Sequence, residues 1–246
     1  MGVERATSFG AESGNYERGR PEYPAEAVAW MLAPLDGADA AVIDIGAGTG
    51  KLTRAVLARP GTTITAVDPD AEMLATLRGV LPDVPGLLGS AEQLPLPDAA
   101  ADAAVLGQAW HWVEPIAASQ EIGRVVRPGG VLGLIWNVRD ERVDWVRRLS
   151  GIMKGSPAEQ MIAENRVRVA APFGGPEEQR WEWKRAMSRP ELHAMARSRS
   201  YVITSPPEEK ARIAREMDAL FDELGLDDGT TIDMPYLTAA YRSIRD

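Results

Sequence analysis

The sequence has no cysteine and only two histidines, His111 and His193, among its 246 residues. Without cysteine, disulfides, thiolate zinc sites and cysteine nucleophiles are all excluded. The two histidines lie too far apart in the sequence to form a metal-binding motif. We therefore expect neither thiol chemistry nor a bound metal.

Positive charge is also scarce, since 27 Lys and Arg stand against 36 Asp and Glu, a formal net charge of −9. Binding to phosphates depends largely on Lys and Arg, so a nucleic-acid partner is disfavoured. No run approaches the roughly 20 apolar residues of a membrane span. Residues 1–8 contain no apolar signal region, and Ala6 breaks the myristoylation pattern. These absences predict a cytoplasmic protein with a small-molecule partner and no membrane partner.

The most informative stretch is an apolar run that ends in three alternate glycines. Ala40–Ile45 is short, apolar and partly β-branched, as expected of a central parallel strand, and residues 51–58 resemble a helix. Gly46, Gly48 and Gly50 allow a tight turn between the two elements and the close approach of a ligand. A strand, a glycine turn and a helix N-terminus together predict a nucleotide site.

The spacing of the glycines excludes two common nucleotide motifs. In a P-loop, Gly50-Lys51 would be preceded by a glycine where Ile45 stands and followed by a hydroxyl residue where Leu52 stands. The dinucleotide fingerprint needs a third glycine at the position of Lys51. Neither a P-loop nor a standard dinucleotide site is therefore predicted.

The pattern that is present, Asp-x-Gly-x-Gly-x-Gly, resembles the first motif of the class I S-adenosylmethionine-dependent methyltransferases. The resemblance implies that S-adenosylmethionine is the cofactor and S-adenosylhomocysteine the product. It also implies an α/β, Rossmann-like doubly wound sheet of seven strands, the last antiparallel, with a helical insertion or lid over the site. The cofactor-binding residues that it implies here are Asp44, Gly46, Ala47, Gly48 and Gly50.

A second buried strand, residues 63–68, ends in an acid. Asp68 lies 24 residues after Asp44 (68 − 44), close to the spacing at which Rossmann-like sites present a carboxylate to ribose hydroxyls. The alternative is that Asp68 caps a helix whose first residue is Pro69. Met73 on that helix is a candidate for the adenosine pocket, with core packing as its alternative.

A short third strand, residues 86–89, leads into a further candidate segment. Its position resembles the second cofactor contact of the family, where an acid or its neighbour meets the adenine amine. Ala91, through its backbone N–H, and Glu92, through its side chain, occupy the matching places. The alternative for Glu92 is a surface charge.

The fourth strand, residues 101–108, ends in an aromatic segment that contains Gln108, Ala109, Trp110, His111 and Trp112. The tips of parallel strands face the ligand crevice, so these side chains are expected beside the methyl donor or acceptor. The segment resembles methyltransferases related to the ubiquinone/menaquinone- and trans-aconitate-methylating enzymes. His111 has a suitable pKa for a general base; the alternative is a ring hydrogen-bonded beneath the loop.

Residues outside the central motifs complete the predicted site. In look-alike methyltransferases, a segment resembling residues 16–24 folds over the cofactor, which implies cofactor contacts for Tyr16 and Arg20 and an acceptor contact for Tyr23. Aromatic rings suit a sulfonium because its charge favours a π face. Asn137 and Arg139 follow the fifth strand, where either would orient an acceptor, and the fork of Arg139 suits a carboxylate.

The chain is predicted to form one methyltransferase domain over residues 1–246, long enough for a sizeable core. Its parts are a cofactor-covering segment (1–36), a cofactor-binding core (37–137) and an acceptor-side insertion with the C-terminal strands (138–246). Residues 140–180 are the expected insertion. The remaining helices are expected at 25–32, 71–81, 116–127, 145–153, 157–169, 191–197 and 211–224, and the remaining strands at 131–136, 180–185 and 231–243.

The predicted function is transfer of a methyl group from S-adenosylmethionine to a small-molecule acceptor. Two alternatives stay open at this point. An NAD-dependent oxidoreductase would share the strand, the glycine turn and the ribose acid, and a non-catalytic S-adenosylmethionine-binding or interaction protein would keep Asp44 and Asp68 but turn over no acceptor.

Overall fold

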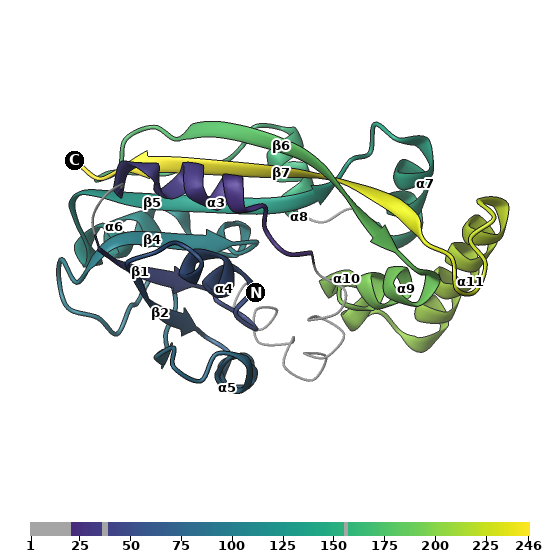
Figure 1. Cartoon of the computed structure of the whole chain (residues 1–246), viewed down its shortest axis with the longest axis horizontal. Coiled ribbons are helices and arrows are strands. Elements are labelled where there is room, and N and C mark those ends of the chain that lie inside the picture. Colours follow the sequence, from purple (N-terminus) through teal and green to yellow (C-terminus); the bar gives the residue numbers. More distant parts are fainter. Residues whose placement is uncertain (1–20, 36–38, 155–156) are drawn as a thin grey trace.

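A seven-stranded sheet forms the centre of the computed structural model, which describes residues 21–35, 39–154 and 157–246. The strand order is β3-β2-β1-β4-β5-β7-β6, with β1 to β5 parallel and β7 antiparallel to both of its neighbours (Figure 1). The predicted doubly wound sheet with an antiparallel last strand is confirmed. The strands are β1 (Ala40–Ile45), β2 (Thr62–Asp68), β3 (Gly86–Leu88), β4 (Ala101–Gly107), β5 (Val126–Arg139), β6 (Glu177–Met187) and β7 (Ile232–Ile244).

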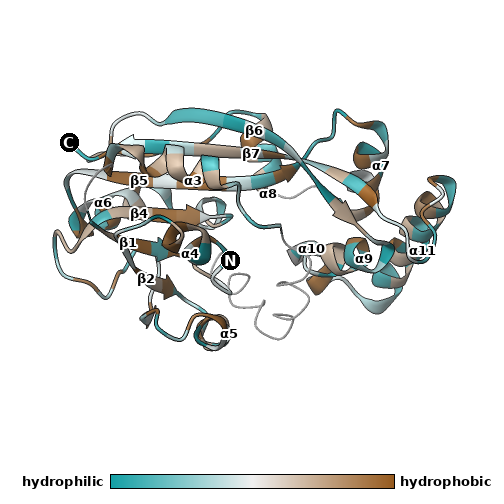
Figure 2. Cartoon of the chain, in the orientation of Figure 1, coloured by the Kyte–Doolittle hydropathy of each residue, from teal (hydrophilic) through white to brown (hydrophobic). Residues whose placement is uncertain are grey.

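Helices cover both faces of this sheet because alternate residues of each central strand point to opposite sides. Ile43 and Ile45 of β1 join a core beneath α6, whereas Val42 joins a second core beneath α3 and α4. Apolar residues therefore fill β1 and β4 almost completely, as Figure 2 shows. The helices are α3 (Ala25–Leu32), α4 (Lys51–Leu57), α5 (Ala71–Val80), α6 (Pro115–Val125), α7 (Asp144–Met153), α8 (Pro157–Ala163), α9 (Arg189–Arg197), α10 (Ser200–Thr204) and α11 (Pro207–Glu223).

A third core lies where the β6–β7 ribbon extends beyond β5. The first residues of β7, before Tyr236, pair only with β6 among the described strands. Helices α7, α9 and α11 gather at this end of the ribbon (Figure 1). Phe221 and Met217 of α11 are fully buried there. The ribbon thus carries a separate helical cluster to one end of the molecule.

Several element boundaries differ from the sequence-based expectation. Helix α8 ends at Ala163 instead of continuing to residue 169. Strand β5 begins at Val126, because residues 127–130 form an irregularity within the strand: Val126 pairs with Ala101, and Val131 with Ala103. Helices α9 and α11 lie between β6 and β7, where two helices were expected, whereas the short α10 between them was not predicted.

None of the helices in the described part of the chain is long and apolar enough to cross a membrane.

Candidate functional site

The glycine turn follows β1 at the carboxyl edge of the parallel strands. Gly46, Gly48 and Gly50 have φ of 69°, 56° and 91°, a region that side-chain-bearing residues rarely adopt. The N–H of Gly46 donates to the carbonyl of Val67 at 2.8 Å, which attaches the turn to β2. A Cβ at Gly46 would lie 2.8 Å from the Cβ of Ala109, whereas a Cβ at Gly48 would meet no atom of the chain within 4 Å. The turn is therefore packed at Gly46 and open at Gly48.

Asp68, at the end of β2, is buried beside this turn. Its Oδ2 accepts the N–H of Gly48 at 2.8 Å, and its Oδ1 accepts the N–H of Asp70 at 2.8 Å. Burial raises the pKa of its carboxyl, and the two backbone N–H groups act in the opposite direction. Each carboxylate oxygen has a second lone pair, so ligand hydroxyls can still be accepted.

The helix cap that was the alternative role for Asp68 belongs to another residue. Asp70 is the N-cap of α5, and its Oδ1 accepts the N–H groups of Glu72 and Met73 at 2.9 and 3.3 Å. Pro69 is therefore outside the helix, which begins at Ala71 as predicted, and the alternative in which Asp68 caps a helix that starts at Pro69 was wrong. The short side chain of Asp70 in an extended backbone satisfies the free N–H groups of the first turn.

Asp44, beneath the glycine turn, is a fully buried acid. Its Oδ2 accepts the Thr53 hydroxyl at 2.6 Å, while its Oδ1 has no hydrogen-bond partner among the described residues. Burial and, less strongly, the negative charge of Asp68 raise the pKa of Asp44 to about 7, while the hydrogen bonds from Thr53 act in the opposite direction. The arrangement favours a positively charged group as a neighbour of Asp44.

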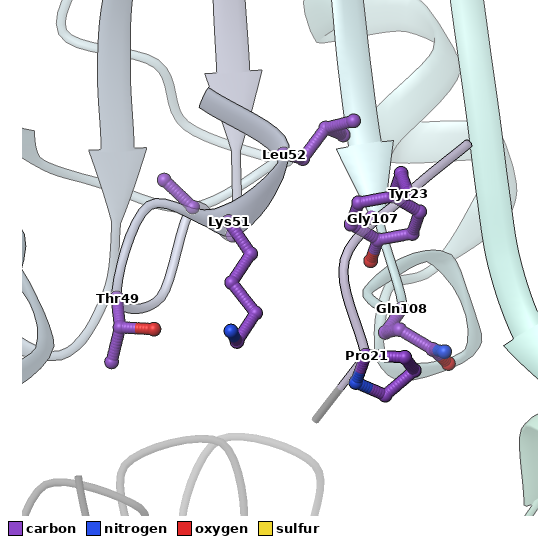
Figure 3. A pocket seen from close by; sticks show the side chains of 9 residues that line it. Pro21, Tyr23, Thr49, Lys51, Leu52, Gly107 and Gln108 are labelled. Carbon is purple, nitrogen blue, oxygen red and sulfur yellow. The ribbon is translucent and has the colours of Figure 1, made fainter. Parts of the chain in front are cut away.

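A pocket of about 400 Å³ opens beside the glycine turn. Figure 3 shows Thr49 and Lys51 on one side of this space and Pro21, Tyr23 and Gln108 on the other. Lys51 Nζ lies 2.9 Å from Glu22 Oε1, which links α4 to the segment before α3. The residues that line the pocket are Pro21, Tyr23, Gly46, Ala47, Thr49, Lys51, Leu52, Gly107 and Gln108.

Tyr23 reaches this pocket because the end of β4 leaves room for it. A Cβ at Gly107 would lie 2.6 Å from the Tyr23 hydroxyl oxygen. The Gln108 side chain turns away toward β5, where its Nε2 donates to the carbonyl of Asn137 at 2.8 Å. The glycine at the end of β4 thus lets an aromatic ring from before α3 cover the strand.

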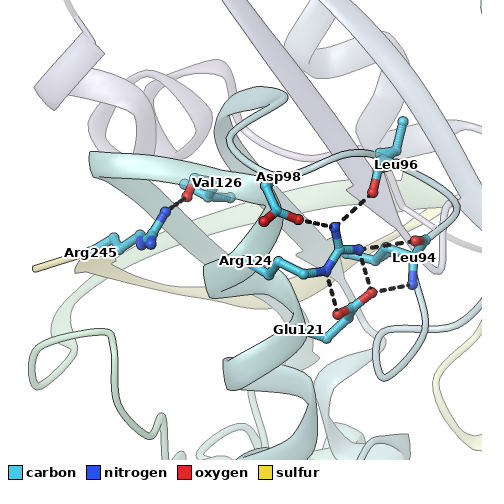
Figure 4. Close-up of polar contacts among 7 residues, drawn as sticks. All are labelled: Leu94, Leu96, Asp98, Glu121, Arg124, Val126 and Arg245. Atoms are coloured by element: carbon cyan, nitrogen blue, oxygen red, sulfur yellow. Dashed lines mark hydrogen bonds and ion pairs between the residues drawn. The ribbon is translucent and has the colours of Figure 1, made fainter.

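Arg124 fixes the loop that carries Ala91 and Glu92. Its guanidinium binds Glu121, Asp98 and the carbonyls of Leu94 and Leu96, as Figure 4 shows. Hydrogen bonds with Glu121 and Asp98 raise the pKa of Arg124 above its usual range. The loop between β3 and β4 is therefore attached to α6.

Within this loop, the two predicted adenine-contacting residues differ in exposure. Ala91 is buried, whereas Glu92 is exposed and its Oε1 accepts the N–H of Glu114 at 2.9 Å. Met73 is also buried, on α5. Ala91, Glu92 and Met73 do not line the pocket beside the glycine turn.

The aromatic segment after β4 is used mainly for packing. Trp110 is only 2% exposed, and its indole N–H donates to the carbonyl of Arg168 at 2.9 Å. The indole N–H of Trp136 donates to Nδ1 of His111 at 3.4 Å, and the His111 ring lies 4.7 Å from that of Trp112. With Nδ1 as an acceptor, the proton of a neutral His111 is on Nε2. This geometry favours the alternative role of a hydrogen-bonded ring over that of a general base.

A second pocket, of about 310 Å³, shares Pro21 and Gln108 with the first. Asn137 is held at its edge: its Oδ1 accepts the Thr238 hydroxyl at 2.6 Å and its Nδ2 donates to the carbonyl of Glu22 at 3.0 Å. The other lining residues are Arg139, Glu159, Met195, Arg199 and Tyr236. The sheet, the helical insertion and the segment before α3 thus meet at this pocket.

The comparisons with known proteins identify the chain. A methyltransferase-domain family matches residues 43–134. An uncharacterized methyltransferase of Mycobacterium tuberculosis is 42% identical over 243 residues, which span 98% of this chain and 96% of that protein. The chain belongs to this methyltransferase family.

Two further matches agree with this assignment. A ubiquinone/menaquinone biosynthesis C-methyltransferase of Caulobacter vibrioides is 41% identical over 118 residues, 43% of this methyltransferase and 46% of the relative. A solved structure of a candidate type II methyltransferase from Anaeromyxobacter dehalogenans has a TM-score of 0.64 at 23% identity, covering 91% and 97% of the two chains. The latter supports the fold alone. The predicted resemblance to class I methyltransferases is confirmed.

The residues predicted for this methyltransferase fall into three groups. The structure brings Gly46, Ala47, Gln108 and Tyr23 together around the first pocket, and Asn137 and Arg139 around the second. Their roles toward cofactor and acceptor stay predictions, as do those of the remaining residues. Tyr16 and Arg20 lie outside the described residues.

Several lining residues of the methyltransferase were not predicted. Thr49, Lys51 and Gly107 directly adjoin predicted residues, and Leu52 lies two residues from Gly50, so their positions near the motif would have been a sufficient signal. Glu159 and Arg199 had no such signal, because each resembles an ordinary charged residue of a helical segment.

Proposed function

We propose that this methyltransferase uses S-adenosylmethionine to methylate a small-molecule acceptor. The observation that supports this most strongly is the link between Asp68 and the open glycine turn, in which Gly48 donates to Oδ2 at 2.8 Å. The bond holds a carboxylate and a Cβ-free backbone side by side at the end of adjacent parallel strands. This is where ligands of doubly wound sheets bind.

The residues present fit this cofactor. Asp68 has lone pairs for the ribose hydroxyls, and Gly48 leaves space for a close approach. Asp44 offers a buried oxygen without a partner in the described chain, which a nearby ammonium group would balance. Ala91 and Glu92 are the proposed adenine contacts, and Met73, Pro69, Ala109 and Trp110 are proposed to border the same site. Pro21 and Gln108 line both pockets, so the proposed cofactor site adjoins the second pocket.

When bound, S-adenosylmethionine supplies a methyl group on a positively charged sulfur. The chain's own contribution is then alignment and the exclusion of water, and alignment can lower a barrier by about 7–11 kcal/mol. A general base is needed only for an acceptor that is protonated at the working pH. The bond from Trp136 to His111 therefore does not weigh against methyl transfer.

With the first pocket proposed for the cofactor, the acceptor would occupy the second, which suits a small molecule. The net charge of −9 disfavours a nucleic acid as acceptor. The name of the Caulobacter relative refers to ubiquinone/menaquinone biosynthesis.

Calorimetric titration of S-adenosylhomocysteine, with NAD as the comparison ligand, tests the proposal. We expect micromolar binding of S-adenosylhomocysteine and no heat with NAD. Asp68→Ala should lose about 1.5–3 kcal/mol of binding free energy, since it removes a charged hydrogen-bond acceptor. Asp83→Ala, at an exposed acid after α5, is the matched control and should bind normally. A folded wild-type protein that does not bind S-adenosylhomocysteine would overturn the proposal.

A further inference from the structure

Two buried arginines share one glutamate at the wall of the second pocket. Arg139 Nη2 lies 2.9 Å from Glu159 Oε1, and Arg199 Nη2 lies 2.8 Å from Glu159 Oε2. Arg139 also donates from Nε to the Ser150 hydroxyl at 3.1 Å. The arginines are only 5% and 8% exposed. This cluster joins β5, α7, α8 and the residue before α10.

The charges of this cluster do not balance among the described residues that line the pocket. Two guanidinium groups face one carboxylate, and a charge removed from water is costly unless it is paired. Burial and the neighbouring Arg199 lower the pKa of Arg139 to about 10, while Glu159 and, more weakly, Glu141 act in the opposite direction. Arg139 is therefore cationic at neutral pH, and two guanidinium groups against one carboxylate give the pocket wall an excess positive charge.

Arg139 also retains hydrogen-bonding capacity. Its Nη2 is close enough to Glu159 for an ion pair, but the geometry is not that of a hydrogen bond, and this buried atom has no other hydrogen-bond partner in the described chain. A second negative group at the pocket wall would supply both the missing acceptor and the missing charge.

We propose that the methyl acceptor carries a carboxylate, and that Arg139 and Arg199 bind it while Glu159 neutralises one of their two charges. This inference rests on the proposed function, because the pocket adjoins the proposed cofactor pocket through Pro21 and Gln108. One excess positive charge matches a carboxylate better than a phosphate monoester, which is nearly doubly charged at neutral pH. The planar fork of arginine also matches the carboxylate plane.

Hexanoate and its neutral analogue hexanamide are suitable probes, titrated into the wild-type protein with and without saturating S-adenosylhomocysteine. We expect hexanoate to bind at least tenfold more tightly than hexanamide. Arg139→Gln and Arg199→Gln should each reduce this preference at least fivefold. Arg148→Gln, at an exposed arginine of α7 that pairs with Glu223, is the matched control and should leave it unchanged.

Glu159→Gln separates ligand binding from a structural role. It removes the carboxylate that competes for both arginines, so hexanoate should bind several-fold more tightly than to the wild type. If the cluster has only a structural role, changing Glu159 should instead abolish any binding of hexanoate.

Equal binding of hexanoate and hexanamide by the wild type would overturn the inference, as would a preference unchanged in Arg199→Gln. S-adenosylhomocysteine binding reports independently on folding and on the proposed function. Should that cofactor product fail to bind, the comparison of hexanoate with hexanamide in the unliganded protein still decides whether the arginines form an anion site.

Discussion

The cofactor side and the acceptor side of the site are formed by different parts of the chain. On the cofactor side, backbone N–H groups, glycines and acids meet at the ends of adjacent parallel strands, as in the bond from Gly48 to Asp68. On the acceptor side, long side chains from β5, α8 and the segment before α10 converge, as in Arg139, Glu159 and Arg199. Backbone geometry fixes the first half, whereas the second depends on how helices of the insertion pack. The proposed cofactor is thus served by a local motif, and the proposed acceptor by tertiary structure.

We expect the largest effect from Asp44→Asn, which removes the buried charge on the cofactor side. The folded pKa of about 7 exceeds the ordinary carboxyl value of 3.8, so the folded state binds more protons and the wild type loses stability as pH rises from about 4 to 7. The variant lacks this loss and should be more stable at pH 8 by up to about 4 kcal/mol. Urea unfolding at pH 4 and pH 8 measures the difference. An equal stability change at both pH values would contradict the buried-charge account.

A smaller effect is expected where the two halves are joined, at Trp110. Trp110→Phe leaves the Arg168 carbonyl without its 2.9 Å donor and removes buried volume, so we expect a loss of about 2–3 kcal/mol in unfolding free energy. Trp112→Phe, at a half-buried neighbour, should lose less than about 1 kcal/mol. Normal stability of the Trp110 variant together with lost S-adenosylhomocysteine binding would instead assign Trp110 to the cofactor.

Substitutions at two glycines with similar backbones separate cofactor binding from stability. Gly48 lies at the proposed cofactor site, whereas Gly229 lies between α11 and β7. Gly48 and Gly229 have φ of 56° and 85°, and a Cβ at either would meet no atom within 4 Å. Alanine at each should reduce stability by about 1–2 kcal/mol, because both backbones are left-handed. Only Gly48→Ala should weaken S-adenosylhomocysteine, by about tenfold, as measured by calorimetry. Equal affinity in the two variants would show that Gly48 serves the turn alone.

The smallest effect is expected from Arg124→Gln. Its ion pairs are partly exposed, so we expect a loss of about 1 kcal/mol. Amide hydrogen exchange should become faster at Leu94, whose N–H donates to Glu121 at 2.8 Å. Arg142→Gln, in an exposed network with Asp140 and Glu182 on the acceptor side, should leave that amide unchanged. Unchanged exchange at Leu94 in the Arg124 variant would show that the loop is held by other contacts.

The cofactor side of the site was more predictable from the sequence than the acceptor side. The alternating glycines, the strand before them and Asp68 predicted the first half, because each depends on backbone conformation within a short segment. The cap at Asp70 was missed because two acids flank Pro69, and only the start of the helix decides between them.

The acceptor side of the site was predicted only in part. Arg139 was found from its position after β5, but its partners were not, since Glu159 and Arg199 come from segments distant in sequence. Trp110 resembled a ligand-facing ring because strand ends usually face the crevice, yet its N–H donates to Arg168, on the loop that follows α8. Packing of this kind leaves no local pattern in the sequence.

The position of β7 has a consequence for the order in which the chain folds during synthesis. Strand β6 pairs only with β7 among the described strands, and α9, α10 and α11 are translated between them. Strands β1 to β5 leave the ribosome before β6, and β6 cannot pair in the sheet until β7 has been translated. The proposed acceptor pocket, which includes Tyr236 of β7, is therefore completed after the glycine turn has been synthesised. The residues proposed for the cofactor are thus all translated before the set proposed for the acceptor is complete.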